Sequence, residues 1–192
     1  MNAPQSSVLD APADRVLPAA GAEEVESEDR ALPVWSSRPY ADADREAVLE
    51  LFTEPDFFFR TAHPDTRPQW EILALIDEDT RLLFANGALI GLYAATQTGA
   101  EHACHMQLQL NLRSSAPEAW WPAAYAEIVR ALLWRREVVR LAMEVGEFDE
   151  RGLRAARAIG LTEEGTLGNL CVRGGRRYGF VFFSQIWEPS CD

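Results

Sequence analysis

The stretch Val138–Leu170 reads VVRLAMEVGEFDERGLRAARAIGLTEEGTLGNL, and its local signals predict the centre of the fold. In residues 138–145, every second residue from Val139 to Val145 is a large apolar one, and the residues between them include Arg140 and Glu144. This alternation is typical of a strand with one face on a core. Asp149 is placed to cap a helix, and Glu150 lies in the first turn, where a carboxylate suits the helix dipole. Gly160 is a residue type that ends helices, and Leu161 begins a second extended segment. The stretch therefore predicts a strand, a short capped helix and another strand.

This segment resembles the C-terminal half of the GNAT acyltransferase superfamily, where a strand leads to N-x-R-S/A and then to LGF-x-x-EG-x-L. Residues 159–167 read IGLTEEGTL. The resemblance is closest to the branch of ribosomal-protein alanine acetyltransferases and extends over about residues 35–186. It implies an α/β (α+β) fold, a mixed, twisted sheet of about six to seven strands with helices on both faces. Two positions depart from the family: Asp149 replaces its usual Asn, and Ala156 replaces a Tyr that protonates the leaving thiolate in many members.

The length of 192 residues suits one domain. We expect a disordered acidic tail over residues 1–31, the acyltransferase-like domain over 32–187 and a loose tail over 188–192. The net charge of −12 lies in residues 1–80, which hold 6 Arg and 18 acidic residues, whereas residues 81–192 are balanced. This charge argues against general affinity for nucleic acids. Without a signal peptide, an apolar span or paired cysteines, the sequence predicts a cytoplasmic protein that does not contact membranes.

The hydrophobic patterns predict the order β-α-α-β-β-β-α-β-α-β-β. The expected strands are residues 34–40, 81–85, 89–97, 102–113, 138–145, 169–173 and 178–186. The expected helices are residues 45–52, 70–76, 127–134 and 150–159. Asn86-Gly87 is a strong hairpin signal between the second and third strands.

The resemblance implies a donor site at the start of the helix after the fourth strand. There the family loop Q/R-x-x-G-x-G/A presents backbone N–H groups to the pyrophosphate of acyl-CoA, as helix N-termini do for anions. Aligning residues 130–133 with the family helix places this loop at residues 120–125, WWPAAY. That loop is degenerate, because Tyr125 is bulky and Pro122 has no amide N–H. Ser115–Glu118 reads as a capping box upstream, so amides of residues 115–119 are the alternative.

Three interpretations of the donor remain open. Acetyl-CoA or another acyl-CoA is the first, held by Arg113, Arg135, Arg136 or Arg154. An aminoacyl-tRNA or an acyl carrier protein is the second, because grouped arginines suit a phosphate backbone. A catalytically silent binding module is the third. The candidate donor-binding residues are Leu110, Asn111, Leu112, Arg113, Ser115, Trp121, Ala123, Ala124, Tyr125, Asp149 and Arg154.

Acyl transfer to an amine requires loss of an amine proton and polarisation of the donor carbonyl. The resemblance implies that a free amide of residues 110–112 polarises the carbonyl. His105 is the candidate base, because an imidazole titrates near neutral pH, with Glu101 and a water held by Gln107 or Gln109 behind it. A polar strand face without chemistry is the alternative for these residues. A phenolic proton for the leaving group would come from Tyr178 or Tyr93.

The aromatic run Phe57–Phe59 is flanked by prolines, in the region that shapes the acceptor pocket in the resembling family. The candidate acceptor residues are Phe57, Phe58, Phe59, Tyr93 and Gln109, and the alternative is that the phenylalanines are core. His102 and Cys104 share a strand face while His105 points away, so we expect no metal site.

Taken together, the sequence predicts an N-acyltransferase that moves an acetyl or larger acyl group from acyl-CoA to a small-molecule amine. Transfer from aminoacyl-tRNA or a carrier protein is the alternative, and a silent binding module is third. We expect a monomer or a homodimer.

Overall fold

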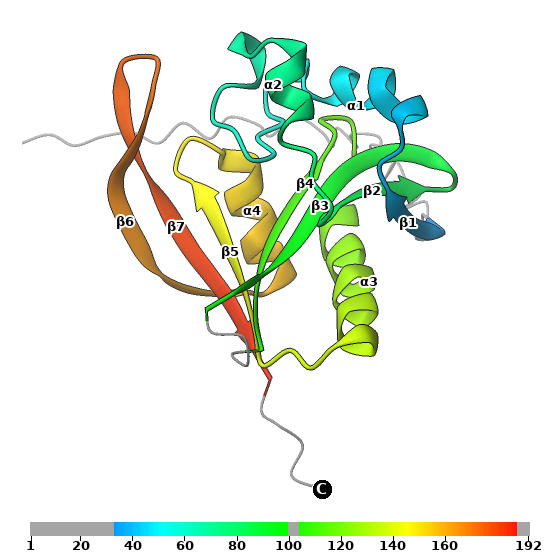
Figure 1. Cartoon of the computed structure of the whole chain (residues 1–192). Helices are drawn as coiled ribbons and strands as arrows, with labels where there is room; N and C mark the ends of the chain where they lie inside the picture. Colours follow the sequence, from blue (N-terminus) through cyan, green and yellow to red (C-terminus); the bar gives the residue numbers. More distant parts are fainter. Residues whose placement is uncertain (1–32, 100–103, 188–192) are drawn as a thin grey trace, which may run out of the picture. The chain divides into compact units, whose positions relative to one another are not determined.

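The computed structural model describes residues 33–99 and 104–187, so the predicted tails at 1–31 and 188–192 lie outside the described residues. Helices and strands follow one another in the predicted order (Figure 1). The strands are β1 (Trp35–Pro39), β2 (Thr80–Ala85), β3 (Ala88–Thr98), β4 (His105–Leu112), β5 (Arg140–Gly146), β6 (Thr162–Arg173) and β7 (Arg176–Ile186). The α-helices are α1 (Arg45–Leu51), α2 (Gln69–Leu73), α3 (Trp120–Arg135) and α4 (Glu150–Ile159), and two 3-10 turns are η1 (Asp42–Asp44) and η2 (Pro64–Thr66).

The strands form one 7-stranded mixed sheet in the order β1-β2-β3-β4-β5-β7-β6. β4 and β5 are parallel, and the other neighbouring pairs are antiparallel. The predicted hairpin between β2 and β3 is confirmed, with φ of 51° at Asn86 and 82° at Gly87. Positive φ at both central residues is what a tight hairpin turn requires. The fold class predicted from the sequence is therefore confirmed.

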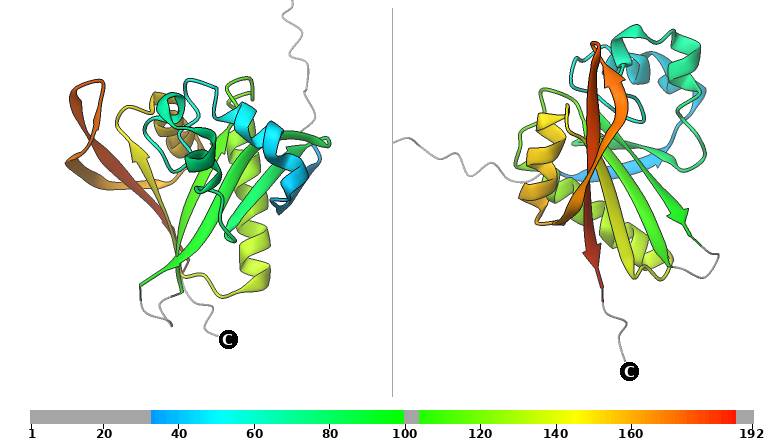
Figure 2. Two further views of the ribbon diagram at one scale, coloured as in Figure 1. Left: turned by 45° about the horizontal axis from the view of Figure 1, so that its top comes forward. Right: turned by 90° about the vertical axis from the view of Figure 1, so that its left-hand side faces the viewer.

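Helices cover both faces of the sheet, because successive strand residues point to opposite sides. Leu82 and Leu92 belong to a core beneath α1 and α2, together with Phe52. Their chain neighbours Leu83 and Tyr93 belong to a larger core on the other face, beneath α3 and α4. Figure 2 shows α4 on one side of the sheet and α1 and α2 on the other. Within the described ranges, no helix is both long and apolar enough to cross a membrane.

The predicted strand and capped helix at residues 138–160 are confirmed. The Asp149 carboxylate accepts a hydrogen bond from the Gly152 amide at 2.7 Å, which caps α4. Gly160 ends the helix with a left-handed φ of 87°. The helix thus begins and ends at the residues that local chemistry indicates.

The predicted start of the third helix, at Glu127, is wrong. α3 begins at Trp120, and its buried residues Trp121, Ala124, Tyr125 and Ile128 recur at helical spacing. Pro122 is tolerated because the amides of the first turn have no partner within the helix. The residues assigned to a phosphate-binding loop therefore form the first two turns of a helix.

Gly91 allows β3 and β4 to approach each other closely. It pairs with Leu112, and a Cβ on Gly91 would come within 2.3 Å of the Asn111 carbonyl oxygen. We expect Gly91→Ala to lower the free energy of unfolding by about 2 kcal/mol, measured by urea denaturation, because backbone must shift. Gly168→Ala is the control, since a Cβ there meets nothing within 4 Å. An equal effect of the two substitutions would contradict this explanation.

Candidate functional site

The sheet opens between its two parallel strands. β4 and β5 pair at three positions only, His105↔Arg140, Met106↔Leu141 and Gln107↔Ala142. Beyond Gln107 and Ala142 the strands diverge, as Figure 1 shows toward the end of the sheet where α2 lies. Their facing backbone groups are therefore not joined to each other along this stretch, and such groups need other partners.

A cleft of about 540 Å³ occupies the opening. Residues 108–111 of β4 and 143–146 of β5 form two walls, and residues of the β6–β7 hairpin and of the segment 58–67 form the others. Its polar side chains are those of Arg60, Thr61, His63, Arg67, Gln109, Asn111, Glu144 and Asp149. A concave site with several converging polar groups is the ordinary form of a ligand pocket.

Arg60 fixes one wall of this cleft. Its Nε donates to Gln109 Oε1 at 3.0 Å, and a terminal nitrogen donates to the Leu75 carbonyl oxygen at 2.9 Å. Arg60 also forms an ion pair with Asp77. These bonds join the segment after α1 to the residues that follow α2 and to β4, so the Gln109 amide is held in place within the cleft.

Aromatic rings form the rim. The Phe148 ring lies edge-on to those of Phe58, Tyr178 and Phe180, with centroids 5.1, 5.7 and 6.1 Å away. The Arg173 guanidinium lies 4.6 Å from the Phe58 centroid and 5.4 Å from that of Phe148. Rings and a cation packed this way attract each other. The rim thus already holds one cation in an aromatic setting.

Asp149 is the buried carboxyl of the cleft, at 6 % exposure. Burial raises the pKa of Asp149 to about 6, and the nearby Asp56 charge acts in the same direction. The Gly152 amide, Arg151 and Arg173 oppose this rise in the pKa. A carboxyl with a raised pKa in a cleft is a candidate for proton transfer.

Trp121 contributes an unsatisfied donor. The side chain lines the cleft and is 2 % exposed, and its buried Nε1 has no hydrogen-bond partner among the described residues. Buried polar groups ordinarily have a partner, so this N–H is an exception in the wall of the cleft.

Solved structures resemble this chain over most of its length. RimL, a ribosomal L7/L12 alpha-N-protein acetyltransferase in complex with coenzyme A, has a TM-score of 0.65 and 12% identity, over 79% of this chain and 93% of that one. An acetyltransferase of the GNAT family from Bacillus anthracis has a TM-score of 0.64 and 13% identity, over 81% and 96%. The yncA protein of Salmonella typhimurium with its cofactor acetyl-CoA has a TM-score of 0.61 and 12% identity, over 82% and 96%. The chain has the GNAT fold.

The likeness to GNAT acetyltransferases comes from structure alone. No protein-family model matches the sequence, and no curated protein matches it. At identities of 12–13% in these three matches, the backbone arrangement is shared while most side chains differ. What the cleft of this GNAT fold does must therefore be argued from its own residues.

The donor-binding residues predicted from the sequence fall into two groups in the GNAT fold. Leu110, Asn111, Trp121 and Asp149 line the cleft. The other predicted donor-binding residues, Leu112, Arg113, Ser115, Ala123, Ala124, Tyr125 and Arg154, are not among its lining residues. Residues 120–125, which were expected to form a pyrophosphate loop, are helical, and the Tyr125 hydroxyl donates to Gln185 Oε1 at 2.7 Å; their part in donor binding stays a prediction. Side-chain packing thus explains the aromatic residues there.

Two of the three predicted catalytic residues lie away from the cleft. His105 and Gln107 belong to the paired part of β4 and do not line the cleft, and Glu101 lies outside the described residues. The roles of these three residues therefore stay predictions.

Of the predicted acceptor residues, Phe58 and Gln109 line the cleft. Phe57 and Phe59 are fully buried against Phe52, with ring centroids 5.2 and 6.5 Å from its own. Tyr93 is buried in the larger core, and its hydroxyl lies 3.1 Å from Ser37 Oγ. The alternative that phenylalanines of this run are core thus describes Phe57 and Phe59.

Sequence reasoning did not find Arg60, His63, Arg67, Glu144 or Phe148 as cleft residues. One local signal was present in residues 146–149, Gly-Glu-Phe-Asp, between the strand and the cap. The Phe148 ring lies directly over Gly146, where a Cβ would come within 2.4 Å of the ring. Gly146 lies two residues before Phe148 and three before the helix cap Asp149. A glycine at this place indicates that the aromatic ring packs closely on the backbone.

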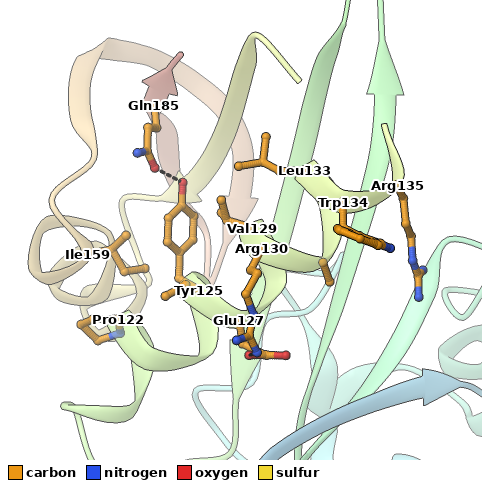
Figure 3. A pocket seen from close by; sticks show the side chains of 12 residues that line it. Pro122, Tyr125, Glu127, Val129, Arg130, Leu133, Trp134, Arg135, Ile159 and Gln185 are labelled. Atoms are coloured by element: carbon orange, nitrogen blue, oxygen red, sulfur yellow. Dashed lines mark hydrogen bonds and ion pairs between the residues drawn. The ribbon is translucent and has the colours of Figure 1, made fainter. Parts of the chain in front are cut away.

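A second hollow, of about 930 Å³, runs along α3 (Figure 3). Figure 3 shows Ile159 of α4 beside Tyr125, with Leu133 and Trp134 farther along α3. Its central polar contact, between Tyr125 and Gln185, is already satisfied. We place the candidate site in the cleft between β4 and β5, because titratable and unsatisfied groups converge there. Among the residues that the structure describes, no group of three His, Cys, Asp or Glu side chains could hold a metal ion.

Proposed function

We propose that this protein transfers an acyl group from an acyl-CoA thioester to the amine of a small molecule. The observation that carries the proposal is the opening of β4 from β5, which leaves a cleft walled by strand edges and polar side chains. Two solved structures of this fold hold coenzyme A or acetyl-CoA. The donor thioester would enter the cleft between the diverging strands.

In the proposed reaction, the amine nitrogen attacks the thioester carbonyl, a C–N bond forms and the C–S bond breaks. A backbone N–H on the open edge of β4 at residues 108–112 would polarise the carbonyl oxygen. The Asp149 carboxylate would accept the proton that the amine loses, and water would return a proton to the departing thiolate. The predicted base His105, with Gln107 and Glu101, is the alternative, and His105→Ala separates the two.

Two carboxylates and two aromatic rings of the cleft can hold the ammonium form of an amine, although the arginines Arg60 and Arg67 also line it. Glu144 and Asp149 line it, and the rings of Phe58 and Phe148 already hold the Arg173 guanidinium. Carboxylates and aromatic faces both attract an ammonium ion before it loses its proton. We therefore propose a primary amine that enters the cleft as its ammonium ion as the acceptor class.

The second candidate function is transfer from a donor other than acyl-CoA. The sequence predicts aminoacyl-tRNA or an acyl carrier protein as this alternative donor. It is favoured by one observation, that Arg176 and Arg177 at the start of β7 are exposed, where they can contact the phosphates of such a donor. Absorbance at the nucleic-acid maximum in the purified protein, and donor binding that weakens steeply with salt, would support the RNA donor.

Cysteine alkylation tests the proposed donor site directly. Cys171 lines the cleft, whereas Cys104 lies just before β4 at its paired end. We expect saturating acetyl-CoA to slow alkylation of Cys171 by about tenfold or more and to leave Cys104 unaffected, measured by mass spectrometry, because a bound ligand excludes the reagent. Release of free CoA with a panel of primary amines then measures turnover.

If acetyl-CoA leaves the alkylation rate of Cys171 unchanged, as it does that of Cys104, the proposed donor site is contradicted. Protection of Cys171 without turnover of any amine would instead favour the silent binding module.

A further inference from the structure

The loop between β4 and α3 has few amides left for an anion. Five amides of residues 113–122 bond within the protein, and Pro117 and Pro122 have none to offer. The bonded amides are those of Arg113 to Ile90 O (2.7 Å), Ser114 to the Glu54 carboxylate, Ala116 to Arg113 O (2.9 Å), Trp120 to Pro117 O (3.0 Å) and Trp121 to Glu118 O (3.2 Å). The remaining amides are those of Ser115, Glu118 and Ala119. A helix N-terminus binds phosphate through free amides, and this one is largely satisfied.

Carboxylates of the protein occupy the loop itself. The Ser114 amide donates to Glu54, and the Ser114 hydroxyl donates to Asp56. Both acids lie in the segment that follows α1, about 60 residues earlier in the chain. Two negative charges therefore stand where a phosphate group would meet the loop, and like charges at this range repel.

The nearby arginines are also engaged. Arg113 pairs with Glu54 at 3.3 Å and with Glu50 at 3.6 Å. Arg151 pairs with Asp56 at 3.4 Å, and it donates to carbonyl oxygens of the loop at Leu112 (2.8 Å), Arg113 (2.6 Å) and Ala116 (3.2 Å).

Arg154 pairs with Glu118 at 3.1 Å. Three guanidinium groups thus face four carboxylates around the loop, and each guanidinium already has a carboxylate partner. Paired arginines leave no excess positive charge for a diphosphate.

We infer that this protein recognises its acyl donor through the thioester arm alone and gains no affinity from a diphosphate at the start of α3. This inference rests on the proposed function, since it names the part of the donor that is recognised. The donor class is an acyl thioester on an uncharged pantetheine-like arm, which reaches the cleft between β4 and β5. A nucleotide diphosphate at the far end of the arm adds nothing.

Calorimetric titration with CoA and with pantetheine, which lacks every phosphate, tests the inference. We expect the two dissociation constants to agree within tenfold, because each charge-assisted hydrogen bond to phosphate is worth about tenfold or more. Tighter binding of CoA by tenfold or more would overturn the inference and leave the proposed function intact. Failure of both ligands to bind at millimolar concentration would overturn the proposed function and the inference with it.

A pair of charge-neutralising variants tests the physical cause. Glu54→Gln keeps an acceptor for the Ser114 amide and removes the charge, so we expect it to tighten CoA binding at least threefold without changing pantetheine binding. Glu50→Gln is the matched control, because Glu50 pairs with the same Arg113 but is 70% exposed. An unchanged ratio of the two dissociation constants in Glu54→Gln would overturn the role of this carboxylate.

Discussion

Replacing Arg151 by methionine is expected to lower the free energy of unfolding by about 3 kcal/mol, as measured by urea denaturation. The side chain is 11% exposed, donates to three loop carbonyls and pairs with Asp56. Its guanidinium also lies 5.4 Å from the centroid of the Trp121 ring. Methionine keeps much of the side-chain volume but removes the Arg151 hydrogen bonds to the carbonyl oxygens of Leu112, Arg113 and Ala116 and the ion pair with Asp56. The Arg113 oxygen keeps the Ala116 amide and Asp56 keeps the Ser114 hydroxyl, so the cost falls chiefly on the other two oxygens and on the lost charge pair.

Arg154→Met is the matched control for this prediction. Arg154 is one turn farther along α4, and its side chain is 55% exposed and forms an ion pair with the exposed Glu118. Because surface ion pairs contribute little, we expect a change below about 1 kcal/mol. Equal losses in the two variants would show that Arg151 does not hold the loop after β4.

The second large effect is expected at Asp149. Asp149→Asn should raise the free energy of unfolding near pH 8 by about 3 kcal/mol and change it little near pH 4. Asparagine keeps the oxygen that caps α4 but carries no charge, so burial no longer opposes it. Urea denaturation of both proteins across this pH range measures the difference.

The sign follows from the raised pKa. The pKa of Asp149 rises from 3.8 to about 6, chiefly through burial, so the folded state favours the protonated carboxyl. The stabilisation that comes from the raised pKa of Asp149 is fully present below pH 3.8 and is lost as the pH rises through about 6. The wild-type protein should therefore lose stability over this window relative to Asp149→Asn. Parallel pH profiles of the two proteins would contradict the raised pKa.

Activity separates the proposed catalytic role of Asp149 from its structural role. If Asp149 accepts the amine proton, Asp149→Asn should lower kcat/KM by about a hundredfold or more while stability rises. Asp149→Ala is the control for the helix cap, and it should be about 1 kcal/mol less stable than Asp149→Asn at every pH. Full activity in Asp149→Asn would remove this residue from the proposed mechanism.

Local signals predicted much of the fold. Asn86-Gly87 marked a hairpin because few residue types adopt two successive left-handed conformations. The residues Asp149 and Gly160 marked the ends of α4 because caps satisfy backbone groups within one turn. The start of α3 was missed because the family alignment assigned residues 120–125 to a loop, whereas their buried positions recur at helical spacing.

The candidate site was less accessible to sequence reasoning. Arg60 is held in the cleft by bonds to Gln109 and Leu75, which lie 49 and 15 residues away. The segment between α1 and α2 that carries Arg60 and His63 has few periodic signals, so nothing local indicated which wall it would form. Its place is fixed by contacts such as that of His63 Nε2 with the Val172 carbonyl oxygen, at 2.7 Å.

By itself, the sequence determined the order of helices and strands, because periodicity, caps and turns depend on interactions between residues close in the chain. It also determined that the residues at 120–125 depart from a glycine-rich phosphate loop. Only the tertiary structure decided where β4 and β5 separate and which side chains meet in the opening. Only the tertiary structure, likewise, placed Glu54 and Asp56 against Ser114. These contacts join distant segments whose meeting depends on the packing of the whole sheet and its helices, and no local pattern encodes them.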